Sequence, residues 1–405
     1  MLDRRSLLFA ASLAPWVLAR RSRAHTEDSA RPRRSERSDR PDRALIVFEL
    51  TGGNDGLNTL IPFEDDRYHR ARPTLAIRKH RALALDATQG LHPALPGLRA
   101  SFERGELAIA RGLGSPSPDL SHFKSQDAWS AASVADVPPP TGWVGRLHDV
   151  AQRTGAWSPS ALALLAVGRD TPPPAFAAEH LVAPACMDLT AFARAPVARP
   201  SALGIASTRV AELALADAAA RDAADELARA ARTRVFGAYP ATALGEHARM
   251  AAQLRIAGLP TRVIWITAPS FDTHTRQERE HEILLGRLDA SLAALRDDLA
   301  RAGLLASTAI ATVSEFGRRV SENGVGAEAG TDHGTASIAF LLGGGVRGGF
   351  VGAPSDLGDL DGDGNLRATL DFRDWLATLV AHLRVEPADV LGPGRVAFDV
   401  LGGRA

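Results

Sequence analysis

The sequence predicts an α/β fold in which helices cover both faces of a doubly wound, largely parallel sheet. Three observations support this class. The chain has 405 residues with 45% hydrophobic content, it contains apolar runs that end in glycine, and a long amphipathic helix joins two of those runs. A chain of this size and composition can bury a large core. We expect one domain over residues 44–405.

Five apolar runs are predicted to be buried strands. The first, 44–50, is mostly apolar and turns sharply at Gly52 and Gly53, which is typical of a strand buried on both faces in a parallel sheet. The same pattern recurs in four further segments, 105–114, 261–270, 307–317 and 337–346.

The segment between the third and fourth runs is predicted to be a helix that ends at Gly303. Its apolar residues keep helical spacing and are Ile283, Leu284, Leu288, Leu292, Leu295 and Leu299. A strand, a helix and a second strand in this order form a crossover connection, so we expect a largely parallel sheet with helices on both faces.

Two segments allow alternative interpretations. The alanine-rich span 199–258 is predicted to hold helices over 209–236 and 245–258, which either cap a site or are ordinary packing helices. The aspartates of 356–367 alternate as in a calcium loop, but the glutamate expected at the twelfth loop position is missing. This segment is therefore either a calcium loop or an acidic turn before the final helix, 371–383.

Residues 1–25 are predicted to be a signal segment of the twin-arginine type. Arg4 and Arg5 precede an apolar run, 7–19, which is shorter than the roughly 20 residues that cross a bilayer. The alternatives are an uncleaved membrane anchor and a buried first helix. Residues 26–43 are charged and almost free of apolar side chains, so they are predicted to be a disordered linker. We expect export by the twin-arginine machinery to the periplasm or the cell exterior.

The charge balance disfavours a polyanionic partner, and the cysteine content excludes an intramolecular disulfide. Lysine plus arginine and aspartate plus glutamate both number 47, so the balance does not favour a nucleic-acid partner. Cys186 is the single cysteine, which excludes an intramolecular disulfide even though the predicted compartment would permit one. Beyond the signal segment, no apolar run reaches membrane-spanning length.

Polar side chains follow four of the predicted strands, at the sheet edge where parallel α/β folds bind their ligands. They are Asn54, Asp55 and Asn58 after the first strand, Asp119, Ser121 and His122 after the second, Asp272 and His274 after the third, and Glu315, Asp332 and His333 after the fourth. Because four separate loops bring carboxylates or imidazoles to one edge, the sequence predicts a functional site there.

Aspartate and histidine suit zinc, manganese or a similar divalent ion where thiolate is absent. Asp272 and His274 stand two residues apart on a loop, so both can turn toward one ion. Asp332 and His333 have glycines on both sides, which let backbone and ion approach closely. His281 is either a further ligand or a solvated residue on the following helix.

The segment after the second strand is predicted to run into a helix, with Asp119 or Ser121 near its first residue. A hydroxyl there faces free backbone N–H groups and the positive end of the helix, so Ser121 is either an activated nucleophile beside an anion site or only a helix cap. His122 is the second candidate catalytic residue. The chain has neither a common phosphate loop nor a Gly-x-Ser-x-Gly elbow.

Several motifs together resemble the exported bacterial family called domain of unknown function 1501. They are the twin-arginine leader, "LTGGNDGLNTLIPFEDDRYHRARPTLAI" (50–77), "SHFKSQDAW" (121–129), "TGWVGRL" (141–147), "FDTHTRQEREH" (271–281), "EFGRR" (315–319) and "GTDHGTASIAFLLGGGVRGG" (330–349). That family is in turn similar to the alkaline phosphatase and sulfatase superfamily, which implies a doubly wound sheet and a metal-assisted site.

Carried over by motif, the resemblance implies a role for most of the candidate residues. Asp55 resembles the first metal ligand, Ser121 the nucleophile, Asp272 with His274 one metal pair, and Asp332 with His333 a second pair. Two features depart from the superfamily pattern. His382, in an apparent amphipathic helix, is the only later histidine, and Cys186 is not part of a Cys-x-Pro-x-Arg sulfatase signature.

Two functions are therefore expected as alternatives. The converging aspartates and histidines, with the resemblance, imply an exported metal-dependent hydrolase of phosphate or sulfate esters on a small-molecule or glycan substrate. The unmatched late histidine implies instead a non-catalytic exported binding or assembly protein that keeps the alkaline phosphatase-like fold.

Overall fold

The computed structural model describes residues 42–179, 183–189 and 208–401, with side chains described outside 208–219. The predicted signal segment and nearly all of the predicted linker lie outside these residues. The described part of the chain contains no helix that is both long enough and apolar enough to cross a membrane.

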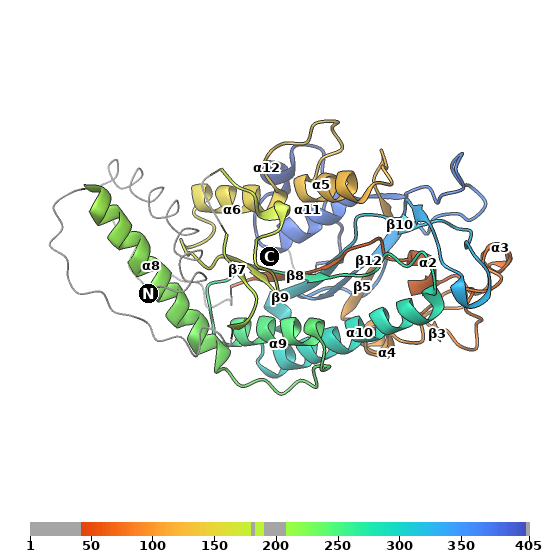
Figure 1. Cartoon of the computed structure of the whole chain (residues 1–405), viewed down its shortest axis with the longest axis horizontal. Coiled ribbons are helices and arrows are strands. Elements are labelled where there is room, and N and C mark those ends of the chain that lie inside the picture. Colours follow the sequence, from red (N-terminus) through yellow and green to blue (C-terminus); the bar gives the residue numbers. More distant parts are fainter. Residues whose placement is uncertain (1–41, 180–182, 190–207, 402–405) are drawn as a thin grey trace.

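A mixed sheet of nine strands forms the centre of the molecule (Figure 1). Its strands are β1 (Ala44–Leu50), β5 (Leu107–Gly114), β6 (Leu164–Val167), β7 (Ala185–Cys186), β8 (Val263–Ala268), β9 (Thr308–Val313), β12 (Ser337–Gly343), β13 (Gly349–Val351) and β14 (Leu370–Asp371). The strand order is β13-β5-β12-β9-β1-β8-β6-β7, and β14 pairs with β5.

The predicted fold class is confirmed. Each of the five predicted strands is present, as β1, β5, β8, β9 and β12, and the central strand β1 is parallel to both neighbours, β8 and β9. The strand β12 is antiparallel to β5 and β9. The connection from β9 to β12 contains no long α-helix. A parallel strand needs a crossover connection, usually a helix, that carries the chain back to the opposite edge of the sheet. Without one, β12 begins at the edge where β9 ends and runs antiparallel to it.

Ten α-helices and three short 3₁₀ helices are described. The α-helices are α2 (Gly56–Thr59), α3 (Asp66–Ala71), α4 (Pro96–Glu103), α5 (His122–Ala131), α6 (Trp143–Thr154), α8 (Thr208–Ala231), α9 (Ala243–Ile256), α10 (Gln277–Arg301), α11 (Phe372–His382) and α12 (Pro387–Leu391). The 3₁₀ helices are η1 (Pro174–Phe176), η2 (Leu305–Ser307) and η3 (Gly326–Glu328). The helix predicted to be the last, α11, is followed by the short α12.

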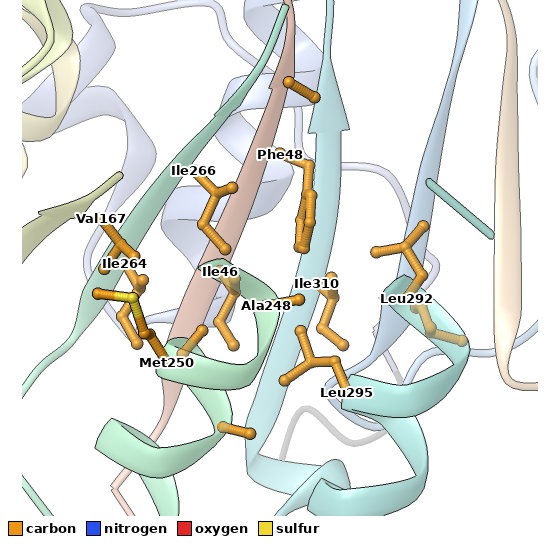
Figure 2. Close-up of a cluster of buried hydrophobic side chains, with 14 of the residues drawn as sticks. Ile46, Phe48, Val167, Ala248, Met250, Ile264, Ile266, Leu292, Leu295 and Ile310 are labelled. Atoms are coloured by element: carbon orange, nitrogen blue, oxygen red, sulfur yellow. The ribbon is translucent and has the colours of Figure 1, made fainter. Parts of the chain in front are cut away.

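Helices cover both faces of the sheet because the central strands are apolar on both sides. On one face, Ile46 and Phe48 of β1 pack with α9 and α10, as Figure 2 shows for Met250 and Leu295. On the other face, Leu45 and Val47 pack with α6 and α11. The predicted helix between β8 and β9 is α10, and it ends at Arg301, two residues before Gly303.

Two small sheets complete the described structure. One consists of β2 (Leu60–Ile61), β4 (Gly90–Leu91) and β3 (Leu83–Ala84), and the other is the antiparallel pair β10 (Gly317–Arg318) and β11 (His333–Gly334). The second pair lies in the connection from β9 to β12, so it belongs to the sheet edge at which β1, β8 and β9 end.

Candidate metal centre

Loops that follow β1, β8 and β9 meet at the carboxyl edge of the sheet, as the sequence predicts. Gly52 has a φ of +115°, and a Cβ atom at this position would lie 2.3 Å from the backbone nitrogen of Asp272. Only glycine therefore allows the loop after β1 to lie directly against the loop after β8. This close approach brings the residues after three strands into one site.

Asp272 lies at the centre of the site. Its Oδ1 accepts a hydrogen bond from Nη2 of Arg318 over 2.6 Å, and the Arg318 side chain is completely buried. Partial burial would raise the pKa of Asp272, but the hydrogen bond and charge of Arg318, with smaller effects of His333 and His274, outweigh burial and lower this pKa to about 2. The carboxylate is therefore ionised at neutral pH.

His333, on β11, points its Nε2 at this carboxylate. The distance from His333 Nε2 to Asp272 Oδ1 is 3.1 Å, and His333 Nδ1 lies 2.8 Å from the carbonyl oxygen of Leu120. A carbonyl oxygen can only accept, so Nδ1 carries a proton, and in the neutral form of the ring the lone pair is then on Nε2, the nitrogen that faces Asp272. The contact with Leu120 thus fixes the tautomer that a metal ligand needs.

His122, the first residue of α5, is held in the same way by a carboxylate. Its Nδ1 lies 3.0 Å from Oε1 of Glu315, and its Nε2 lies 3.4 Å from Oδ2 of Asp272. The Glu315 side chain is only 3% exposed, and the same oxygen accepts the backbone N–H of Gly52 and the side-chain amide of Gln126. Glu315 therefore places the free nitrogen of His122 toward Asp272.

His274 is the third imidazole of the cluster. Its Nδ1 lies 3.3 Å from Oδ1 of Asp332, while its Nε2 lies 3.0 Å from both Asp272 Oδ1 and His333 Nε2. Asp332 is in turn held by the Asn323 side chain, whose Nδ2 donates to the same oxygen over 2.8 Å. Asp332 is therefore in contact with the outer nitrogen of His274.

The three imidazoles share one arrangement: each has Nδ1 next to an oxygen acceptor and Nε2 facing Asp272. If all three rings are neutral with the proton on Nδ1, three lone pairs and a carboxylate converge. Such a group of acceptors can bind a cation in addition to the Arg318 guanidinium, and imidazole nitrogen with carboxylate oxygen is the ligand set of zinc and related ions. His122, Asp272 and His333 offer ligand atoms within 4.8 Å of one another, so the donor set fits a divalent ion.

Ser121 lies beside this cluster. It is the N-cap of α5 and its neighbour Leu120 supplies the carbonyl that holds His333. Its backbone nitrogen donates to Oδ1 of Asp119 over 2.8 Å, but its exposed side chain makes no capping hydrogen bond to the helix. The Ser121 hydroxyl is therefore available at the positive end of a ten-residue helix.

Asp55 is placed in a buried network. Its Oδ1 caps α2 by accepting the backbone N–H groups of Leu57 and Asn58, and its Oδ2 accepts from Arg72 over 2.6 Å and from Gln277. Burial would raise the pKa of Asp55, but the charges of Arg72 and His281 outweigh it and lower this pKa. None of these hydrogen bonds comes from the histidine cluster.

His281 is buried on α10, with 1% of its surface exposed, so of its two predicted alternatives the solvated position is wrong, while the ligand role stays a prediction. Its Nε2 lies 3.0 Å from Oδ1 of Asn54, and its ring packs edge-on against Phe271. Burial lowers the pKa of His281 to about 4. The packing of the helix that follows the Asp272 loop therefore places this ring in the core.

The sequence places Glu315 at the predicted edge but assigns it no role, and it does not predict Arg318 as part of the site. A signal for both existed, because "EFGRR" (315–319) places a carboxylate and a guanidinium directly after a strand at the predicted edge. Their partners, Gly52 and Asp272, lie more than 40 positions away, so the contacts depend on the fold.

Comparison with known families gives a match over most of the chain. The family described as "Protein of unknown function (DUF1501)" matches residues 114–393. Among curated proteins, none matches the chain.

Several solved structures are distantly similar. A protein in the alkaline phosphatase superfamily from Vibrio parahaemolyticus is 9% identical, with 97% of this chain and 78% of that chain covered and a TM-score of 0.39. A phosphonate monoester hydrolase from Silicibacter pomeroyi is 14% identical, with 88% and 76% covered and a TM-score of 0.36. A sulfatase from Pseudoalteromonas sp. is 11% identical, with 98% and 75% covered and a TM-score of 0.38.

Proposed function

We propose that this chain, which belongs to the DUF1501 family, is an exported metal-dependent hydrolase of phosphate or sulfate esters. One observation carries the proposal: three imidazoles, each held at Nδ1 by an oxygen, direct Nε2 at the ionised carboxylate of Asp272. Export is supported by the twin-arginine pattern at Arg4 and Arg5.

His122, His274, His333 and Asp272 would hold the metal. A divalent ion bound there would supply Lewis-acid stabilisation of the negative charge on the ester oxygens. Because the oxygens of Asp55 are occupied by Arg72, Gln277 and the first turn of α2, we propose one ion per chain. Zinc or manganese suits these donors.

The protein's own residues would act on the ester from one side. The positive end of α5 attracts the anionic ester group beside Ser121, whose Oγ forms a bond to phosphorus or sulfur as the bond to the alcohol breaks. Ser121 loses one proton and the departing alcohol gains one. Water then releases the phosphate or sulfate group and restores the Ser121 hydroxyl.

A second candidate is a non-catalytic exported binding or assembly protein. It is favoured by the contact of Arg318 with Asp272 over 2.6 Å, because the buried guanidinium already balances the charge of the carboxylate. In this case Ser121 and His333 would keep their places in the fold without a chemical role.

Elemental analysis and an ester panel test the two candidates. Protein exported by its own leader is expected to carry about one divalent ion per chain and to hydrolyse a 4-nitrophenyl phosphate or sulfate. Asp272→Ala is expected to lose the ion. Ser121→Ala is expected to keep it while turnover falls at least about 1,000-fold.

The matched control is Ser117→Ala, which removes an exposed hydroxyl from the same loop. A wild-type protein without metal and without activity on any ester would overturn the hydrolase. A biological phenotype lost in Ser121→Ala, at unchanged thermal stability, would overturn the non-catalytic candidate.

A further inference from the structure

A cavity of about 630 Å³ lies next to the histidine cluster, at the carboxyl ends of β1, β6 and β8. This volume is in the range of small-molecule sites, about 300 to 1,000 Å³. Its wall includes Glu49 and Thr51 from the first strand and its loop, Arg169 from the loop after β6, and Leu244 and His247 from α9. The alanine-rich segment therefore contributes α9 to the wall of this cavity.

The cavity and the cluster share the helix α5. Phe123 and Gln126 of α5 line the cavity, and they follow His122 on the same helix. Gln126 Nε2 lies 3.1 Å from Oε1 of Glu315, the oxygen that also holds His122. The cavity and the cluster are therefore connected through α5 and Glu315.

The charges of the cavity do not favour a second anionic group. Two carboxylates, Glu49 and Asp127, stand against one guanidinium, that of Arg169. Arg169 is already engaged, because its Nη1 donates to Thr267 Oγ1 over 2.8 Å and lies 3.4 Å from Glu49 Oε2. Burial lowers the pKa of His247, so this ring adds no charge at neutral pH.

The wall instead combines an exposed aromatic ring with hydrogen-bonding groups. The side chain of Phe123 is 82% exposed, and Asp127 follows one helical turn later on the same side of α5. A pyranose ring matches this wall, because its C–H face packs on the ring of Phe123 and its hydroxyls pair with the carboxylate of Asp127.

We infer that this cavity binds the alcohol part of the ester and that this part is a neutral, hydroxyl-rich ring such as a hexose. The inference adds the alcohol part of the substrate to the proposed function, and it rests on that function for the claim that the substrate is an ester. The claim that the cavity recognises a sugar rests on the cavity itself.

Paired substrates test this inference. Hexose 6-phosphate and 6-sulfate are compared with cyclohexylmethyl phosphate and sulfate, which have a six-membered ring and a primary leaving oxygen but no hydroxyls. The full-length protein is expected to prefer the hexose esters at least about tenfold in kcat/KM, because unpaired polar groups in the cavity disfavour the hydrocarbon ring. Asp127→Ala is expected to bring this ratio toward one.

A matched pair of variants tests the aromatic wall. Phe123→Ala is expected to lower kcat/KM for the hexose esters about tenfold. The control is Phe236→Ala, which removes a ring that is also exposed but lies outside the cavity. Equal kinetics of the two variants, or equal use of hexose and cyclohexylmethyl esters by the wild type, would overturn the inference while leaving the hydrolase intact.

Direct binding separates this inference from the proposed function. Free glucose, galactose and mannose are titrated into wild-type protein and into Phe123→Ala, with binding followed by calorimetry. Binding of a hexose that weakens about tenfold in Phe123→Ala, in a protein that hydrolyses no ester, would support the cavity and overturn the hydrolase. Absence of hexose binding, together with ester hydrolysis, would overturn the cavity alone.

Discussion

At the scale of single residues, the centre depends on which ring nitrogen of each histidine carries the proton. The carboxylate of Glu315 can only accept a hydrogen bond from Nδ1 of His122, so in the neutral ring the lone pair is on Nε2, which faces Asp272. In Glu315→Gln, the amide oxygen can keep the contacts with Gly52, Gln126 and His122, but it is uncharged and holds the Nδ1–H of His122 more weakly than the carboxylate does. We expect metal affinity to fall about 10- to 100-fold, measured by competition with a chelator.

Glu106→Gln provides the control for this prediction. Glu106 is also a partly buried carboxylate with arginine partners, Arg104 and Arg296, but it lies outside the cluster. Its substitution is expected to leave metal affinity unchanged. Equal affinity of Glu315→Gln and wild type would show that Glu315 does not position His122.

The sequence was most informative where chemistry-bearing residues directly follow strands. Asp272, His274 and His333 could be placed at one edge because parallel strands end together. The contacts of Glu315 and Arg318 could not be predicted, because each depends on loops that meet through the close approach at Gly52. Asp55 looked similar to the other carboxylates in sequence, and its partner Arg72 appears only in the fold.

At the scale of elements, the connection between β9 and β12 determines the position of His333. The pair β10 and β11 folds this connection back over the loop after β8. Their contact is close at Gly330, where a Cβ atom would lie 2.1 Å from the carbonyl oxygen of His274. A side chain larger than hydrogen would therefore move His333 and His274 apart.

Gly330→Ala is expected to lower metal affinity and to reduce the free energy of unfolding by about 1 to 3 kcal/mol, because the added methyl group overpacks the contact. Chelator competition and urea denaturation measure the two effects. The control is Gly362→Ala, where an added Cβ meets no atom within 4 Å. Wild-type metal affinity in Gly330→Ala would show that the two loops are not closely coupled.

The arrangement of strands was largely predictable because apolar runs buried on both faces stand out in composition. The antiparallel direction of β12 was not predicted from its apolar pattern, since a buried run is similar in both directions. The short strands β6, β7, β13 and β14 were missed for a related reason. Runs of two to four residues carry little periodicity, and they become strands only because a neighbouring strand pairs with them.

At the scale of the whole molecule, stability depends on keeping buried imidazoles neutral. His382, at the end of α11, is completely buried, and its Nε2 donates to the carbonyl oxygen of Ala44 over 3.0 Å. This contact ties a helix on one face to the first residue of the central strand. Burial, followed by the charge of Arg43, lowers the pKa of His382 from 6.5 to about 4.

A pKa lowered by folding makes stability depend on pH with a defined sign. Between pH 6.5 and about pH 4, the unfolded chain binds a proton at this residue that the folded chain does not, so stability falls as pH falls. The shift corresponds to about 3 kcal/mol of unfolding free energy over this window. His382→Gln keeps a donor near Ala44 but cannot titrate. Between pH 7 and 4.5, the fall in its free energy of unfolding is therefore expected to be smaller than that of the wild type by roughly 2 to 3 kcal/mol.

Urea denaturation at a series of pH values measures this difference. His80→Gln, at an exposed position, is the control and is expected to follow the wild type. Because His92 and His281 are also buried, with pKa values lowered to about 3 and about 4, the His382→Gln profile keeps part of its slope. A His382→Gln profile that coincides with the wild type would show that folding does not lower the pKa of this ring.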